Sequence, residues 1–182
     1  MKNREIEAES TFEGFTFDGK KKVVQSLEEL ERIVAKYREE GLVTVFTNGC
    51  FDLLHVGHVR SLVHARKLGD KLIVAVNSDK SIREMKGPPL PIYPQNERVE
   101  ILCALACVDH VFVFDDPTVD RILLRIRPDI HAKGSDYTVE TLPERKTVLS
   151  YGGQIAIVGG PKTHSTRELI RKIRSLREDV RI

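Results

Sequence analysis

Five short runs of apolar residues, separated by segments of helical periodicity, limit the folds open to this sequence. Leu72 to Val76 is the clearest run, because its apolar residues are continuous rather than alternating. Continuous apolar strands are typical of a parallel sheet that helices cover on both faces. Strands that alternate with helices indicate βαβ units with right-handed crossovers.

The predicted fold is therefore α/β: a Rossmann-like, open, parallel five-stranded sheet with helices on both faces. Strands are predicted at 42–47, 72–76, 110–114, 129–132 and 154–158. Helices are predicted at 57–67, 79–85, 96–106, 118–126, 139–150 and 166–177. One more helix is predicted ahead of the first strand, from a capping box at Ser26 and Glu29 to Gly41.

Length and composition are those of one ordinary domain. The 182 residues are 41% hydrophobic and 31% charged, and the net charge is +2, which argues against nucleic-acid or membrane partners. No signal peptide and no apolar run of ~20 residues is present, so a cytoplasmic location is predicted. Residues 1–22 are expected to form an N-terminal extension and residues 23–182 a single domain. Cys50, Cys103 and Cys107 do not form a disulfide pattern.

Polar and glycine-rich clusters follow four of the predicted strands, at residues 55–58, 77–79, 133–137 and 159–166. In an open parallel sheet, ligands bind beyond the carboxyl ends of the strands, where the strand order reverses. The clusters therefore predict a ligand site at one edge of the sheet.

The segment His55-Val56-Gly57-His58 lies where the first predicted strand gives way to a helix. Two histidines three residues apart at a helix start share one face, and a helix N-terminus attracts phosphate. Gly49 and Gly57 have no side chain, so a phosphate can approach the backbone closely. Metal ligation with Cys50 or Asp52 and a purely structural role are the alternatives, and no metal site is predicted.

The run from Gly49 to His58, which reads Gly-x-Phe-Asp-x-Leu-His-x-Gly-His, resembles the signature of the HxGH nucleotidyltransferases. Those enzymes move a nucleoside monophosphate from ATP or CTP to a phosphate or phosphorylated alcohol, and they release pyrophosphate. The resemblance implies the nucleotidyltransferase fold, with the two histidines donating hydrogen bonds to the triphosphate. It also implies nucleotide binding by Asn48, Gly49, Phe51, Asp52 and Gly57.

Two further stretches resemble family motifs that meet phosphates. Lys86, implied to be catalytic, and Arg98 lie in a Lys-Gly … Glu-Arg-x-Glu-Ile-Leu pattern. Ser165 and Thr166 match the start of a Ser-Thr-Thr motif that holds the nucleotide phosphates. The third position departs from the family, because it is Arg167, whose guanidinium can itself contact two phosphate oxygens.

Lys133, Gly134 and Asp136 match the Lys-Gly-Gly-Asp-Tyr motif of the heptose branch of the family, except that Ser135 replaces a glycine. The match implies contact with substrate or nucleotide. That branch transfers AMP from ATP to D-glycero-β-D-manno-heptose 1-phosphate and gives ADP-heptose. ATP is then a substrate, pyrophosphate leaves with Mg²⁺, and direct in-line attack needs no protein nucleophile.

Two other functions stay open: a cytidylyltransferase acting on glycerol 3-phosphate or a phospho-amino-alcohol, and a nucleotide-binding regulatory module without turnover. Relatives lead us to expect a homo-oligomer. In many relatives a sugar-kinase domain precedes this one. Here only about 40 residues precede the first predicted strand, which are too few for a kinase, so the kinase is expected to be a separate protein. We expect His64, His110 and His131 to be ordinary surface or core residues, whereas His164 borders the Ser165 motif and is ambiguous.

Overall fold

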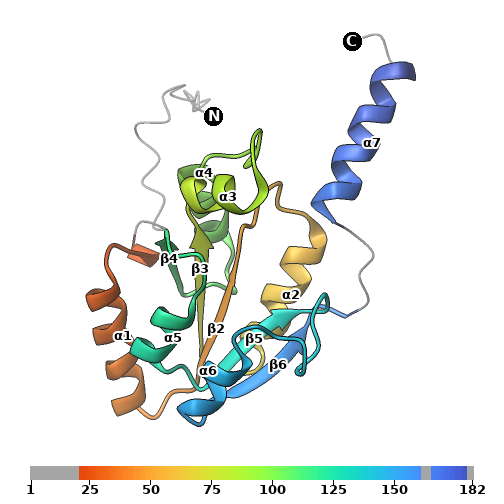
Figure 1. The fold of residues 1–182 in the computed structure, drawn as a ribbon. Coiled ribbons are helices and arrows are strands. Elements are labelled where there is room, and N and C mark those ends of the chain that lie inside the picture. Colours follow the sequence, from red (N-terminus) through yellow and green to blue (C-terminus); the bar gives the residue numbers. More distant parts are fainter. Residues whose placement is uncertain (1–20, 161–164, 180–182) are drawn as a thin grey trace, which may run out of the picture.

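Six parallel strands form one sheet in the computed structural model, which describes residues 21–160 and 165–179; the strand order is β1-β4-β3-β2-β5-β6 (Figure 1). The strands are β1 (Val23–Val24), β2 (Thr44–Gly49), β3 (Lys71–Asn77), β4 (His110–Phe114), β5 (Ile130–Gly134) and β6 (Gln154–Val158). The parallel α/β sheet is as predicted. The predicted number of strands is too low by one, because β1 has only two residues and forms by pairing with β4 rather than through any sequence period.

Helices connect the strands and follow the last one. They are α1 (Leu27–Glu39), α2 (Val56–Arg66), α3 (Asp79–Lys86), α4 (Gln95–Ala104), α5 (Asp120–Ile126), α6 (Arg145–Ser150) and α7 (Thr166–Asp179). The helix predicted at 139–150 begins only at Arg145. Thr138 and Thr141 form a turn in which each hydroxyl accepts the other's backbone N–H, at 2.9 and 3.3 Å. Pro143 follows that turn and has no N–H to donate into a helix.

The two faces of the sheet each bury a separate apolar core. On one face, Leu62 of α2 and Leu102 of α4 are almost fully buried. On the other face, Leu30 of α1, Ile122 of α5 and Val148 of α6 are buried in the same way. Burying such a side chain contributes about 1.5–3 kcal/mol. The continuous apolar run of β3 lies between the two cores, as the sequence predicts.

The strand order reverses beside β2. The chain passes from β2 through α2 to β3 on one side, whereas β4 leads through α5 to β5, which pairs with β2 on the other side. The carboxyl ends of β2 and β5 therefore lie side by side. The region outside these ends is where open parallel sheets bind ligands, and we call this region the switch-point crevice.

Among the described residues, none of the helices has the length and apolar character needed to cross a bilayer. Cys50, Cys103 and Cys107 are free cysteines. Cys103 is buried in an apolar core, and this burial raises the pKa of its thiol to about 11. Cys103 therefore serves as a small apolar core residue.

His131 yields a prediction about acid stability. Its side chain is fully buried, its ring lies 5.7 Å from that of Phe46, and neither ring nitrogen has a hydrogen-bond partner in the described structure. Burial, with a smaller effect of the nearby Lys133 charge, lowers the pKa of His131 to about 3. The unfolded chain titrates near pH ~6.5. Between these values the unfolded state holds the extra proton, so the free energy of unfolding should fall as pH falls, by up to about 1.4 kcal/mol per pH unit.

Urea unfolding between about pH 7 and about pH 4 checks this prediction when the protein is compared with His131→Phe. The variant lacks the buried imidazole of residue 131, so its stability should depend less steeply on pH over this interval. Equal pH dependence in the two proteins would contradict the assignment.

Candidate functional site

The two histidines form a reciprocal cap at the start of α2. His55 is the N-cap residue, and its Nδ1 accepts the backbone N–H of Gly57 at 3.1 Å. In return, the backbone N–H of His55 donates to Nδ1 of His58 at 3.3 Å. The rings stack with their centroids 3.9 Å apart and their planes 23° apart. The prediction that both imidazoles share one face is therefore confirmed.

This cap also fixes which ring nitrogen carries the hydrogen. A neutral imidazole has one donor and one acceptor nitrogen. Because Nδ1 of each ring accepts a backbone N–H, the hydrogen of each neutral ring resides on Nε2. Both Nε2–H groups are thus donors, beside a helix terminus whose partial positive charge favours an anion. The structural role and the phosphate-binding role are compatible, since they use different nitrogens.

The loop before α2 is held in an uncommon backbone conformation. Phe51 and Leu53 have φ of 49° and 46°, in the left-handed region that side chains other than glycine seldom adopt. Each such residue costs of order 1–3 kcal/mol. The ring of Phe51 lies 5.6 Å from that of His58, and a Cβ on Gly49 would lie 3.4 Å from the Phe51 ring. Phe51 therefore packs between Gly49 and the histidine pair.

Asp52 ties this loop to two distant segments. Its carboxylate accepts the backbone N–H groups of Ile92 and Tyr93 at 2.8 and 3.0 Å, which holds the proline-rich loop in place. Its carbonyl accepts the hydroxyl of Thr166, in the first turn of α7, at 3.0 Å. Asp52 is 6% exposed, so its observed interactions position the loops around the site.

Arg98 has internal partners as well. Its side chain is 1% exposed and donates to the carbonyl groups of Cys50 at 2.5 Å and Tyr93 at 3.1 Å. A third bond reaches the carboxylate of Asp79 at 2.9 Å. These partners balance a buried basic residue near the start of α4, where the helix dipole disfavours positive charge. Its contact with phosphate stays a prediction.

Lys133, at the end of β5, joins the two strands at the switch-point crevice. Its ammonium donates to Oδ1 of Asn48, at the end of β2, at 2.7 Å, and to Glu144 at 3.1 Å. It also lies 5.4 Å from the ring centre of Tyr137. The structure thus brings together Asn48 and Lys133, two residues that the sequence predicts separately as parts of the site. Glu144 belongs to no motif, so the sequence alone does not single it out as a site residue.

The Ser165 motif caps α7. The hydroxyl of Ser165 accepts the backbone N–H of Glu168 at 3.1 Å, as expected of an N-cap serine, while Arg167 is exposed. Residues 161–164, including His164, lie outside the described part of the chain.

The end of β6 packs closely against α2. Gly159 has φ of 97°, and a Cβ there would lie 2.2 Å from the hydroxyl oxygen of Ser61. The backbone N–H of Gly159 donates to Nδ1 of His64 at 3.4 Å. Only a glycine satisfies both the backbone angle and the close approach. Gly159 therefore brings the chain beyond β6 up to the histidine helix.

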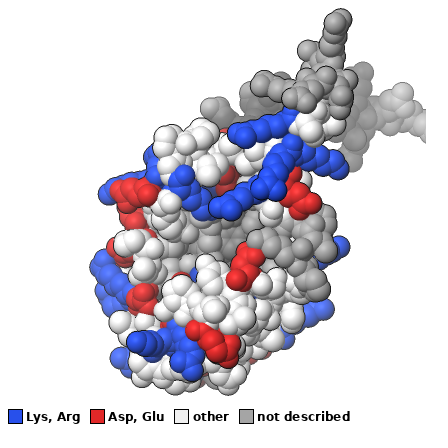
Figure 2. Space-filling model, turned by 45° about the vertical axis from the view of Figure 1, so that its right-hand side comes forward, with Lys and Arg blue, Asp and Glu red and all other residues white. Residues whose placement is uncertain are grey.

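Figure 2 shows a band of Lys and Arg side chains across one face of the molecule. Lys86, the last residue of α3, is exposed. Asp136 is also exposed and follows Gly134 in the loop after β5. The predicted contacts of Lys86, Gly134, Asp136 and Arg167 with ligand stay predictions.

In the described part of the chain, the acidic and histidine residues do not form a metal cage. Within residues 21–160 and 165–179, no group of three or more His, Cys, Asp or Glu residues could hold a metal ion. Mg²⁺ normally binds through one or two carboxylates together with substrate phosphates. The residues present therefore fit a cation that arrives on a triphosphate better than a resident metal.

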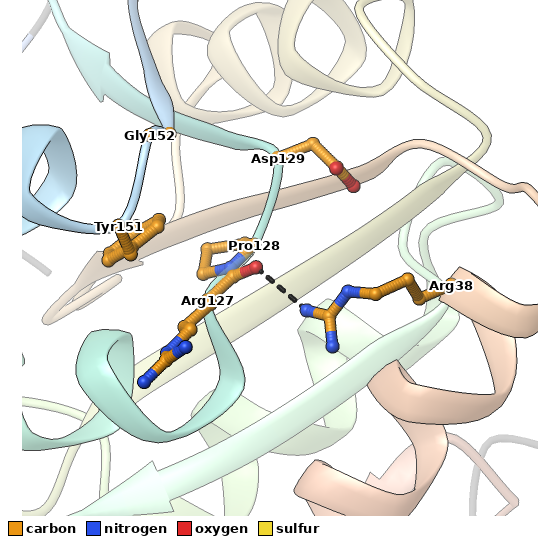
Figure 3. Close-up of a pocket in the computed structure, with 7 residues that line it drawn as sticks. Arg38, Arg127, Pro128, Asp129, Tyr151 and Gly152 are labelled. Atoms are coloured by element: carbon orange, nitrogen blue, oxygen red, sulfur yellow. Dashed lines mark hydrogen bonds between the residues drawn. The ribbon is translucent and has the colours of Figure 1, made fainter.

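A hollow of about 340 Å³ lies at the amino ends of β5 and β6, away from the histidine pair (Figure 3). It is lined by Arg38, Arg127, Pro128, Asp129, Tyr151, Gly152 and Gly153. The guanidinium of Arg38 donates to the carbonyl groups of Ile126 and Arg127 at 3.1 and 3.0 Å, which caps the end of α5. The polar contacts there serve the fold.

Comparison with known proteins gives a family match across the site. A family model described as cytidylyltransferase-like matches residues 46–176, a span that includes every residue predicted to belong to the site.

The chain is also similar to curated proteins. It is 47% identical over 146 residues to the bifunctional protein HldE of Syntrophotalea carbinolica, covering 80% of this chain and 30% of that protein. It is 46% identical over 150 residues to the bifunctional protein HldE of Geobacter sulfurreducens, covering 82% of this chain and 31% of that protein. The chain thus spans about a third of the length of the curated relatives it matches.

Two solved structures resemble the fold. The lipopolysaccharide core biosynthesis protein of Thermoplasma volcanium has a TM-score of 0.55 and 28% identity, over 64% of this chain and 94% of that one. The pantoate-beta-alanine ligase of Francisella tularensis has a TM-score of 0.58 and 14% identity, over 79% of this chain and 68% of that one. At 14% identity the second likeness supports the fold alone.

Gly159→Ala tests the packing of β6 against α2. The positive φ and the contact with Ser61 should together lower the free energy of unfolding by about 1–3 kcal/mol. Adding Ser61→Ala should restore part of this loss, because it removes the hydroxyl that the new methyl group meets. Gly134→Ala is the control, since a Cβ there meets nothing within 4 Å. Urea unfolding measures all four proteins, and equal stability of the two glycine variants would refute the packing argument.

Proposed function

Because the chain belongs to the cytidylyltransferase-like family, we propose that it is a nucleotidyltransferase that transfers AMP from ATP to D-glycero-β-D-manno-heptose 1-phosphate. The products are ADP-heptose and pyrophosphate. The observation that carries the proposal is the stacked pair His55 and His58, whose δ-nitrogens cap α2 and whose ε-nitrogens are donors beside the switch-point crevice. The Lys133 motif of the heptose branch and the similarity to HldE proteins support the choice of acceptor.

The reaction is a direct in-line displacement. An oxygen of the acceptor's phosphate attacks the α-phosphorus of ATP, and a new P–O bond forms. The bond between the α-phosphorus and the bridging oxygen breaks, and the pyrophosphate leaves with the electron pair. The acceptor is already anionic near neutral pH, so the reaction needs no protein nucleophile and no strong general base.

The protein's part is to position the phosphates and to stabilise the charge that moves onto the leaving group. The Nε2–H groups of His55 and His58 donate to the triphosphate, and the backbone N–H groups at the start of α2 add to the positive field. The nucleotide binds against the end of β2 at Asn48 and Gly49, the loop residues Phe51 and Asp52, and Gly57 in the first turn of α2. Mg²⁺ bound to the triphosphate would neutralise part of the charge on the pyrophosphate.

Seven other residues complete the proposed site: Lys86, Arg98, Gly134, Asp136, Ser165, Thr166 and Arg167. Lys86 and Arg167 are exposed basic side chains that suit phosphate oxygens, whereas Arg98, Ser165 and Thr166 act through the loops and the helix end that they hold. The homo-oligomer and the separate sugar kinase stay predictions.

Pyrophosphate release tests the function directly. Purified protein is offered ATP or CTP with heptose 1-phosphate, glycerol 3-phosphate or a phospho-amino-alcohol. Release with ATP and heptose 1-phosphate is the expected result. CTP-dependent release with another acceptor would identify the cytidylyltransferase alternative. Tight nucleotide binding without release in any pairing would identify a regulatory module.

His55→Asn separates the chemical role of the histidine from its structural role. Asparagine is among the best N-cap residues, so the variant should keep its stability within about 1 kcal/mol. It lacks the Nε2–H donor, and losing one such donor should lower kcat about 10²–10³-fold. His64→Asn, the same change later on α2, is the matched control and should keep normal turnover. Normal turnover by His55→Asn would remove the basis of the proposal.

A further inference from the structure

A buried charged cluster lies at the switch-point crevice, built from three elements that are far apart in sequence. Lys133 comes from β5, Asn48 from β2, and Glu144 from the N-cap position of α6. Lys133 is 8% exposed and Glu144 is 6% exposed, so the ion pair is shielded from solvent. We call this set the lysine cluster.

The chemistry of the cluster fixes the orientation of the Asn48 amide. A lysine ammonium has only donors, so the amide oxygen of Asn48 must face it. The NH₂ group, which carries both amide donors, then points away from Lys133. A hydrogen bond from a charged donor also polarises the amide and strengthens its N–H groups as donors.

Glu144 in turn fixes the ammonium. A lysine side chain has four rotatable bonds and does not hold one position unaided. Its ammonium here has a partner on three sides: Asn48 at 2.7 Å, Glu144 at 3.1 Å, and the Tyr137 ring with its centre 5.4 Å away. The carboxylate of Glu144 supplies the only opposite charge among these three contacts.

Stability alone does not explain such a pair. A buried ion pair is often no more stabilising than apolar residues of the same volume, because both charges lose their hydration. This pair lies at the crevice between the ends of β2 and β5, which is the ligand-binding position of the fold. If the pair holds the amide donors of Asn48 toward the ligand, both the position and the burial of the pair are explained.

We propose that Glu144 is a positioning residue for the transfer reaction: through Lys133 it orients the Asn48 amide so that the amide donors face the phosphates of the nucleotide. The inference rests on the proposed function, which places a triphosphate in the crevice. In this arrangement Lys133 orients Asn48, and its charge is balanced by Glu144 rather than offered to the phosphates.

Three variants distinguish the positioning role from a purely structural ion pair and from direct binding of phosphate by Lys133. Glu144→Leu removes the hold on the ammonium, Glu144→Gln keeps an oxygen that can accept its hydrogen bond, and Lys133→Met combined with Glu144→Leu removes both charges. Glu140→Leu, on the exposed loop before α6, is the control and should behave as the unmodified protein. Each protein is measured for kcat, for the KM of ATP, for affinity for a non-hydrolysable ATP analogue, and for stability to urea.

The positioning role predicts that Glu144→Leu lowers kcat/KM about 10²-fold, the usual effect of a small misplacement at an active site. Glu144→Gln should recover at least part of this loss. The double variant should regain stability, since no unpaired charge stays buried, but its activity should remain low.

Two results would overturn the proposal. If the double variant recovers both stability and turnover, the ion pair is only structural. If Glu144→Leu binds the ATP analogue more tightly and keeps its kcat, Lys133 is a direct phosphate ligand that Glu144 restrains.

The unmodified protein separates these outcomes from failure of the proposed function. If the unmodified protein releases no pyrophosphate in any pairing, the proposed function is refuted. The positioning role is then tested by the affinity of the same variants for the ATP analogue. If the unmodified protein binds no nucleotide at all, both proposals are refuted.

Discussion

The reversal of strand order beside β2 is the constraint on which the rest of the structure depends. All strands in the described sheet run parallel, so the carboxyl ends of β2 and β5 meet at one edge. Helices then leave these ends toward opposite faces of the sheet, and the loops between must part. The histidine pair, Asn48 and Lys133 lie at this position, which is the ligand-binding region of an open parallel sheet.

Buried polar contacts hold the loops around that crevice. Asp52 binds the proline-rich loop and the start of α7, and Arg98 joins the histidine loop to the start of α3 through Cys50 and Asp79. Each buried donor or acceptor would cost about 1–3 kcal/mol if its partner were lost. These buried hydrogen bonds therefore hold the loops in place, as apolar packing holds the helices against the sheet. Their observed contacts are with the protein, although their motifs alone suggest contact with a ligand.

The histidine pair shows how one residue can serve fold and chemistry together. Its δ-nitrogens satisfy backbone N–H groups that the start of a helix leaves without partners. That use fixes the hydrogen on the ε-nitrogens and so sets both rings as donors. A helix cap is thus also the proposed catalytic device, and no additional element is needed to orient it.

Most of the fold was predictable because it depends on local patterns. The apolar run at Leu72 to Val76 and the Ser26 cap were read correctly from periodicity and capping chemistry. β1 was missed, because a two-residue strand has no period and exists only through β4. The helix before β6 was predicted too long, because the turn at Thr138 and Thr141 competes with helical hydrogen bonds. The family motif likewise located the histidine pair without a structure.

The α/β class, the order of most elements and the family can be inferred without a structure, since these follow from local periodicity and from one contiguous motif. Which polar residues meet is a property of the folded chain. Glu144 reaches Lys133 across a turn, Arg98 is enclosed by carbonyl groups of two loops, and Gly159 packs against Ser61 of α2, far from it in sequence. Such contacts depend on where distant segments pack, and the identity of a single residue carries no record of its distant partner.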